Sequence, residues 1–230
     1  MEDKANPGKK LIIEVEGQKY LRLPIKTHVI TSDDNIINVA EKYAFPRLKD
    51  GDYLFISERV VAISQGRAFP IAELKPSFWA KLLSKFVYKS PYGIGLGSTW
   101  TMELALREAG LPRILLGVLA SAVTKPFGIR GVFYRVVGKN ISAIDGPCSY
   151  TMPPYNKYAK LAPKDPDKVA RQIKKEINAQ VVIIDANDLG VNILGRSDAE
   201  LDTKWAEAVF KDNPLGQTDE CTPLCIVRQI

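Results

Sequence analysis

Six acidic and amide side chains lie near the ends of predicted strands, where they could bind a metal ion together. They are Asp145, Asp185, Asp188, Gln217, Asp219 and Glu220. The first three follow apolar, strand-like runs, and the last three precede the predicted final strand. Carboxylates at strand ends lie at the rim of a sheet and can converge on a cation, and such oxygen ligands favour Mg or Mn. Asp is also a common turn and cap residue, and composition alone favours that structural role.

The histidine and cysteine content excludes most other metal sites. His28 is the only histidine, so a zinc site built from two or three histidines is impossible. Cys148 stands alone, and Cys221 and Cys225 form only a C-x3-C pair, which is not a zinc-binding pattern. An odd number of cysteines fits a reducing compartment, so we expect a cytoplasmic protein.

A glycine-rich segment, Tyr92–Ser98, precedes a predicted helix, and its backbone N–H groups could hold a phosphate. No Gly-Lys-Ser/Thr follows it, and the G-x-G-x-x-G spacing is missing, so it is neither a P-loop nor a dinucleotide fingerprint. We interpret it as a loop that caps a helix.

The net charge of +6 suits anionic partners such as nucleotides, phosphorylated metabolites or nucleic acid. The basic residues are spread along the chain and no groove-reading motif is present, so we expect no nucleic-acid partner. The densest basic stretch, 157–175, is interpreted as the solvated face of a helix and the loop before it.

The chain length of 230 residues predicts one large domain or two small ones. No apolar run reaches the roughly 18 residues of a membrane span, so we expect no membrane partner. The first ten residues are polar and charged, which is not the pattern of a secretory signal.

Strands and helices are both predicted, without strict alternation. Predicted strands are 10–15 and 19–23 as a hairpin, then 53–56, 60–64, 132–137, 140–144, 181–184 and 223–228. Predicted helices follow the caps Ser32–Asn35 and Asp165–Asp167, and cover 76–88, 101–109 and 198–210; the run 114–123 fits a strand or a helix. This mixture predicts an α+β fold with mixed sheets and packed helices.

Three segments resemble the signatures of one family, in the same order along the chain. Gly51–Val61, continuing to Gln65–Arg67, is similar to "GD-apolar strand-K-V-V-S-K-x-E-G-R". Leu161–Asp167 is similar to "L-L-P-x-D-P-D", and Asn213–Pro223 to "G-Q-x-x-E-x-x-P". Over about residues 20–230 the chain therefore resembles the CofE family, the gamma-glutamyl ligases of the deazaflavin coenzyme F-420.

This resemblance implies a single CofE-like domain over residues 1–230, or two intertwined subdomains, with an N-terminal extension over 1–19. It implies a homodimer that uses GTP or ATP and two divalent ions, Mg or Mn. The terminal phosphoryl group would pass to a substrate carboxylate, and the amino group of L-glutamate would attack the resulting acyl phosphate. Phosphoryl transfer depends on positioning and charge neutralisation, which oxygen-bound cations can supply.

The resemblance also assigns metal ligands residue by residue. Asp145, in Ser142–Cys148, matches the first metal aspartate of the family, and either Asp185 or Asp188 matches the second. Gln217 and Glu220 match the third site.

The nucleotide contacts implied by the resemblance are more scattered. They are Thr27, His28, Val29, Ile30, Cys148, Gly216 and Gln217. Cys148 stands where the family has an asparagine. A histidine can also serve as a general base near neutral pH, but beside Val29 and Ile30 we favour a satisfied, partly buried His28.

One family residue is missing. The nucleotide-contacting lysine of "V-S-K" falls on Ile63, which cannot donate a hydrogen bond to a phosphate. "F-G-R" is not intact either, although Arg196 lies nearby. Two hypotheses therefore remain: a divergent ligase with L-glutamate or a similar amino acid and a carboxylate acceptor as substrates, or a nucleotide- or metabolite-binding relative that has lost ligase activity.

Overall fold

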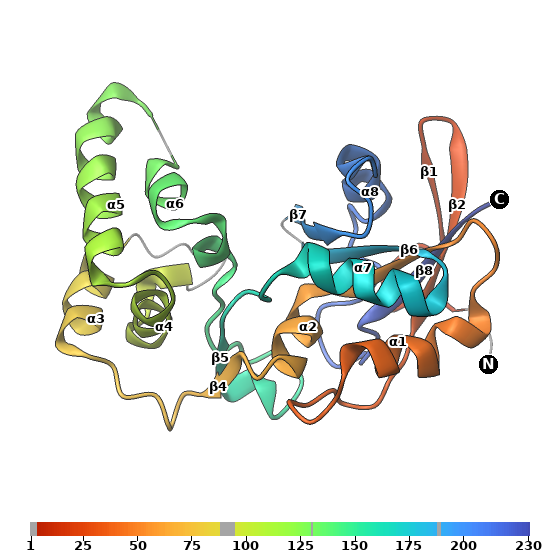
Figure 1. Cartoon of the computed structure of the whole chain (residues 1–230), viewed down its shortest axis with the longest axis horizontal. Helices are drawn as coiled ribbons and strands as arrows, with labels where there is room; N and C mark the ends of the chain where they lie inside the picture. Colours follow the sequence, from red (N-terminus) through yellow and green to blue (C-terminus); the bar gives the residue numbers. More distant parts are fainter. Residues whose placement is uncertain (1–3, 88–94, 130, 188–189) are drawn as a thin grey trace. The chain divides into compact units, whose positions relative to one another are not determined.

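A computed structural model describes residues 4–87, 95–129, 131–187 and 190–230 (Figure 1). The chain forms two compact units. Unit 1 comprises Met1–Gly66, Tyr150–Met152 and Pro163–Ile230, and unit 2 comprises Arg67–Ser149 and Pro153–Ala162. Asp188 and the first three residues of the glycine-rich segment, 92–94, lie outside the described residues.

Unit 1 is built on a six-stranded sheet with the strand order β1-β2-β8-β3-β6-β7. Its strands are β1 Ile12–Val15, β2 Gln18–Ile25, β3 Tyr53–Ser57, β6 Gln180–Asn187, β7 Gly190–Arg196 and β8 Leu224–Gln229. β3 and β6 pair in parallel, and every other neighbouring pair is antiparallel. The last strand of the chain, β8, therefore lies inside the sheet, between β2 and β3.

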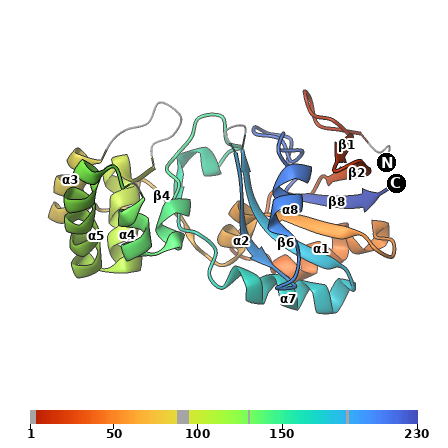
Figure 2. The ribbon, with the colours of Figure 1, turned by 90° about the horizontal axis from the view of Figure 1, so that it is seen from above.

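Helices pack on both faces of this sheet. They are α1 Ile36–Tyr43, α2 Glu58–Ser64, α7 Pro166–Ile177 and α8 Thr203–Val209, with a 3-10 turn η1 at Phe45–Arg47. Figure 2 shows α1 and α7 below the sheet and α8 above it. On the α8 side, Phe210 stacks on Phe55 of β3 with ring centroids 4.2 Å apart. This mixed sheet with packed helices confirms the predicted α+β class.

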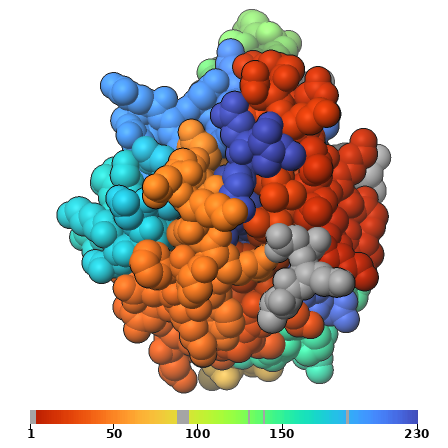
Figure 3. All heavy atoms as spheres, turned by 90° about the vertical axis from the view of Figure 1, so that its right-hand side faces the viewer, coloured from red at the N-terminus to blue at the C-terminus, as the bar shows by residue number. Residues whose placement is uncertain are grey.

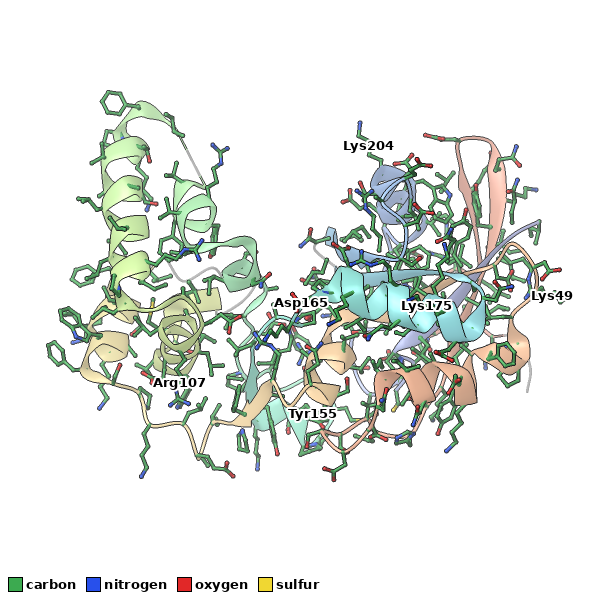
Figure 4. The ribbon with its side chains drawn as sticks, in the orientation of Figure 1. Lys49, Arg107, Tyr155, Asp165, Lys175 and Lys204 are labelled. Carbon is green, nitrogen blue, oxygen red and sulfur yellow. The ribbon has the colours of Figure 1, made fainter. Side chains whose placement is uncertain are left out.

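Local sequence signals account for several of these boundaries. Glu16 and Gly17 both have positive φ, which is the conformation of a tight two-residue hairpin turn between β1 and β2. The Asn35 side chain accepts a hydrogen bond from the Ile37 N–H at 2.8 Å and so caps α1. Pro166 occupies the first helical position of α7, where its missing N–H costs nothing. Figure 4 shows Asp165 at the start of this helix.

The C-terminal strand is held in place by an ion pair. Arg228 donates to both carboxylate oxygens of Asp52, at 2.8 and 2.7 Å, and to the Arg47 carbonyl oxygen at 3.2 Å. Asp52 is buried, so the bidentate pair also satisfies its carboxylate. In Figure 3 the last residues of the chain, in dark blue, lie at the surface between N-terminal residues in red and the segment before β3 in orange.

Unit 2 is mainly helical. Its elements are β4 Ala68–Pro70, α3 Phe78–Leu83, η2 Ser84–Phe86, η3 Gly95–Gly97, α4 Thr99–Ala109, α5 Leu111–Thr124, η4 Lys125–Phe127, α6 Val132–Val137, η5 Lys139–Ala143, η6 Tyr155–Lys157 and β5 Tyr158–Lys160. β4 and β5 form an antiparallel pair. Gly117 lets α6 approach α5, because a Cβ there would lie 2.8 Å from Val137 Cγ1.

The face of α5 away from Gly117 is apolar and exposed. Leu115, Leu119 and Val123 follow one another at helical spacing, and Leu116 and Val118 flank them. Their exposed fractions lie between 40% and 62%. No described element covers this face, so α5 presents an uncharged apolar surface to solvent.

Three strand predictions were wrong. Residues 60–64 lie in α2, residues 132–137 form α6, and residues 140–144 lie largely in the 3-10 helix η5. These runs are rich in Val and Ile, whose strand preference reflects packing and is overridden when a helix buries them better. The undecided run 114–123 is helical, and β4, β5 and β7 were not predicted.

Candidate functional site

β2 and β3 finish at the same end of the unit 1 sheet, which we call the sheet edge, and the neighbouring strand β6 runs past it. β8 is antiparallel to β2 and β3, and β6 is parallel to β3, so β2, β3 and β6 run in the same direction. The register places Ile25, Leu224, Ile56 and Ile183 in one row across the sheet. The residues that follow β2 and β3 therefore leave the sheet at this edge, where the segment before β8 arrives, whereas β6 continues to Asn187.

Two carboxylates lie at the same level of neighbouring strands at this edge. Ser57 pairs with Ile184, and the next residues in each strand direction are Glu58 and Asp185. Glu58 begins α2, whereas Asp185, predicted to follow its strand, lies inside β6 and pairs with Asn192 of β7. Adjacent strands lie about 4.8 Å apart, so these residues belong to one local region. Glu58 is buried and begins α2, where the positive end of the helix dipole favours an acidic side chain. Asp185 was predicted as a site residue but Glu58 was not, although Glu58 lies only two positions after the predicted strand 53–56.

The loop before β8 presents Gln217 and Glu220 in a defined conformation. Asn213 is buried, and its Nδ2 donates to the Gly216 carbonyl oxygen at 2.8 Å and to Gln217 Oε1 at 3.0 Å. Glu220 Oε2 accepts the Thr218 N–H at 2.8 Å. Gly216 has φ +81°, and a Cβ there would lie 2.5 Å from Glu220 Cδ. The Glu220 carboxylate therefore occupies the space that any larger residue at 216 would need.

Residues 27–30, which the resemblance predicts to contact the nucleotide, are hydrogen-bonded to this loop. The Thr27 N–H donates to the Cys221 carbonyl oxygen at 3.0 Å, and Cys221 Sγ lies 3.4 Å from the Thr27 carbonyl oxygen. Residues 27–30 directly follow β2, with Val29 exposed and Ile30 buried. The structure thus brings Thr27 to the loop that carries Gly216, Gln217 and Glu220. Asp185 lies in β6, which is separated from β8 by β3.

His28 has a partner for each ring nitrogen. Nδ1 lies 2.9 Å from the Tyr43 hydroxyl oxygen and Nε2 lies 2.8 Å from Asp34 Oδ1. A hydrogen bond from the Thr31 N–H, and then the His28 contact, lower the pKa of Asp34 below its ordinary value. The histidine is satisfied, as expected, but its side chain is 40% exposed.

Asp145 and Cys148 belong to unit 2. Asp145 forms an isolated antiparallel bridge with Lys160, and its Oδ2 lies 3.2 Å from Lys160 Nζ. Lys160 is buried and also donates to the Ala143 carbonyl oxygen at 3.0 Å. The prediction that the basic stretch 157–175 is solvated was therefore wrong at Lys160. This residue is buried and neutralises Asp145, a predicted metal ligand. Other members of the stretch are exposed, such as Lys175 of α7 (Figure 4).

The donor types at the sheet edge suit a hard cation, because they are carboxylate and amide oxygens. Within the described ranges, no group of three or more His, Cys, Asp or Glu side chains lies close enough to hold a metal ion by itself. Mg commonly needs only one or two protein carboxylates, with waters and substrate phosphates completing its coordination. The residue types at the edge would therefore suit a cation only with phosphate oxygens or waters completing its coordination. No helix in the described part of the chain is long and apolar enough to cross a membrane.

Comparisons with known proteins identify the family of the chain. Residues 24–193, from β2 into β7, match the family described as F420-0:Gamma-glutamyl ligase. The chain is 27% identical over 172 residues to the coenzyme F420:L-glutamate ligase of Methanopyrus kandleri, covering 74% of this chain and 56% of that protein. It is 24% identical over 178 residues to an uncharacterized protein of Methanocaldococcus jannaschii, covering 71% of this chain and 56% of that protein. The chain therefore matches just over half the length of these relatives. Because the family match extends over most of the chain, this protein belongs to the F420-0:gamma-glutamyl ligase family.

Proposed function

We propose that the protein is a metal-assisted ligase that uses GTP or ATP to join L-glutamate, or a similar amino acid, to a carboxylate acceptor, as in coenzyme F-420 biosynthesis. The observation that carries the proposal is the shared sheet edge. Glu58 follows β3 there, Thr27 is hydrogen-bonded to the loop bearing Gln217 and Glu220, and Asp185 follows the Ser57–Ile184 pair in β6, in a chain of this ligase family.

The proposed reaction has two steps. An oxygen of the acceptor carboxylate attacks the terminal phosphorus of the nucleotide, and the bond to the bridging oxygen breaks, which releases the diphosphate. The amino group then attacks the carbonyl carbon of the acyl phosphate, inorganic phosphate leaves, and the nitrogen loses a proton to form the amide. The nucleotide thus drives an amide bond that would not form from two free ions.

The residues of the sheet edge would bind and orient the reactants. Asp185, Gln217 and Glu220 would hold Mg or Mn, which neutralises the phosphate charge during transfer. Residues 27–30 and Gly216 would contact the nucleotide, since they adjoin the same loop. Hydrogen bonds from Asn213 and from the Thr218 N–H fix the Gln217 and Glu220 side chains before substrate binds, and such preorganisation reduces the cost of aligning reactants.

The test compares acidic residues of the edge with a neighbour that faces solvent. The purified chain is assayed for phosphate release from GTP or ATP with Mg or Mn, L-glutamate and coenzyme F-420-0, and the product is identified by its added glutamyl mass. Asp185→Asn and Glu220→Gln should each lower kcat/KM by about 100-fold, the effect of about 2.7 kcal/mol of transition-state stabilisation. The control Asp219→Asn changes an exposed residue next to Glu220 and should retain activity. Full turnover in both edge variants would exclude this site.

A nucleotide- or metabolite-binding role without ligation is the second candidate. Ile63 is buried in α2, where the family signature has a lysine. Lys160 also pairs with Asp145, the residue that matches the first metal ligand. This alternative expects nucleotide to raise the melting temperature while no phosphate is released with any acceptor.

A further inference from the structure

A pocket of about 380 Å³ lies beside the loop that carries Glu220. Its lining combines Lys4 and Asn6 from the N-terminal segment, Lys26 from the end of β2, and Glu220 and Thr222 from the segment before β8. All of these residues belong to unit 1, so the pocket lies within one compact body. Lys26 adjoins Thr27, which is bound to the same loop, so the pocket borders the proposed ligase site.

The polar wall of the pocket is fixed by hydrogen bonds. Asn6 Nδ2 donates to Thr222 Oγ1 and to the Pro214 carbonyl oxygen, both at 2.8 Å. Thr222 Oγ1 donates in turn to the Leu215 carbonyl oxygen at 2.7 Å. These bonds attach Asn6, and with it the N-terminal side of the pocket, to the segment 214–222.

The pocket carries the two ammonium groups of Lys4 and Lys26, besides the Glu220 carboxylate that the proposed function assigns to the metal ion. An acidic amino acid complements these two ammonium groups with its two carboxylates. Its size also suits the space, because ligand pockets of several hundred Å³ hold molecules of this size with solvent. Charge-assisted hydrogen bonds between ammonium and carboxylate groups are roughly twice as strong as neutral ones, so this arrangement can select the ligand.

We infer that this pocket is the subsite for the amino-acid substrate, and the inference rests on the proposed ligase function. The carboxylates of an acidic amino acid bind Lys4 and Lys26, which leaves its amino group free on the side of the loop that carries Glu220. The nucleophilic nitrogen is then directed to the loop where the acyl phosphate is to be attacked. Apart from Lys26, the lining residues fall outside residues 24–193, the range of the family match.

The experiment measures binding and kinetics in the full chain. Lys26→Met and Lys4→Met remove one ammonium each and keep a long side chain, and Lys19→Met is the matched control on the exposed surface of β2. We expect each pocket variant to raise the KM for L-glutamate about tenfold, as expected when a hydrogen bond to a charged group is lost. The KM for the nucleotide and the melting temperature without ligand should stay unchanged. Lys19→Met should match the unmodified chain throughout.

A binding measurement separates this inference from the proposed function. L-glutamate should raise the melting temperature of the unmodified chain more than L-glutamine or inorganic phosphate does, and Lys26→Met should abolish the difference. This result would support the subsite even if no ligase turnover were found. Equal stabilisation by phosphate and glutamate would overturn the amino-acid assignment. So would ligase activity whose KM for glutamate is the same in both pocket variants as in Lys19→Met.

Discussion

Gly216 is the position where one added methyl group tests the arrangement of the candidate site. Its φ of +81° lies in the left-handed region, and a Cβ would stand 2.5 Å from Glu220 Cδ and 2.7 Å from Oε2. Gly216→Ala must therefore strain the backbone and also displace the Glu220 carboxylate from the Thr218 N–H.

The two effects can be separated by a matched glycine. Gly51 has φ +83°, and a Cβ there would meet nothing within 4 Å. Gly51→Ala should cost only the left-handed strain of an L-residue, about 1–2 kcal/mol. Gly216→Ala should also remove the hydrogen bond between the Thr218 N–H and the Glu220 carboxylate. A hydrogen bond to a charged group contributes at least about 1.5 kcal/mol, and we use this lower limit because the site is partly exposed. We expect a total of about 3 kcal/mol.

Urea unfolding followed by Trp205 fluorescence measures both variants. Trp79 and Trp100 belong to unit 2 and are replaced by Phe in this background, so that the signal reports on unit 1. Combining Gly216→Ala with Glu220→Ala completes a double-mutant cycle, in which the excess cost of Gly216→Ala should disappear. If Gly216→Ala costs no more than Gly51→Ala, Glu220 does not occupy the position described and the reasoning fails.

Three further predictions follow from burial, charge and close contact. Burial raises the pKa of Cys225 to about 12, so iodoacetamide at pH 8 should leave Cys225 unmodified in the folded protein and alkylate it in urea. Mass spectrometry that finds Cys225 modified without urea would contradict this prediction. Burial raises the pKa of Asp212, but the hydrogen bond and charge of Arg22 outweigh it and hold that pKa below its ordinary value. The stability from this pair is therefore complete above about pH 4 and lost as pH falls through the lowered pKa; Asp212→Asn should flatten that part of the stability–pH curve, and an unchanged slope would refute the role of the pair. Gly195→Ala would place a Cβ 2.5 Å from the Pro166 carbonyl carbon, a backbone atom that cannot rotate away. We therefore expect the free energy of unfolding, measured with urea, to fall by more than about 3 kcal/mol. A decrease below about 1 kcal/mol would show that α7 can shift.

Elements with a local signal could be predicted from the sequence. The β1–β2 hairpin, the Asn35 cap of α1 and the start of α7 at Pro166 each depend on a few adjacent residues, and each was confirmed. The strand predictions for 132–137 and 140–144 were wrong because their Val and Ile residues fit either a strand or a helix. Only packing decides between the two structures. In α6, Val137 packs against α5 because Gly117 of α5 has no side chain.

The candidate site was predictable in residue type but not in grouping. Asp185, Gln217 and Glu220 were found because carboxylates and amides near strand ends are visible in the sequence. Their common edge depends on the parallel pairing of β3 with β6 and on the central place of β8, which are contacts between distant segments. The Lys160 contact of Asp145 is of the same kind, because it joins two strand-like segments 15 positions apart in the chain.

The uncharged outer face of α5 affects how the protein behaves in solution. Between Glu108 and Asp145 the sequence contains five basic residues and no acidic one, so copies of the chain repel each other around this helix at low ionic strength. Added salt screens that repulsion over a shorter Debye length, and sulfate or phosphate also strengthens apolar association. Colloidal stability therefore decreases as ionic strength rises, and low-salt buffers without sulfate are the better medium for concentrated samples.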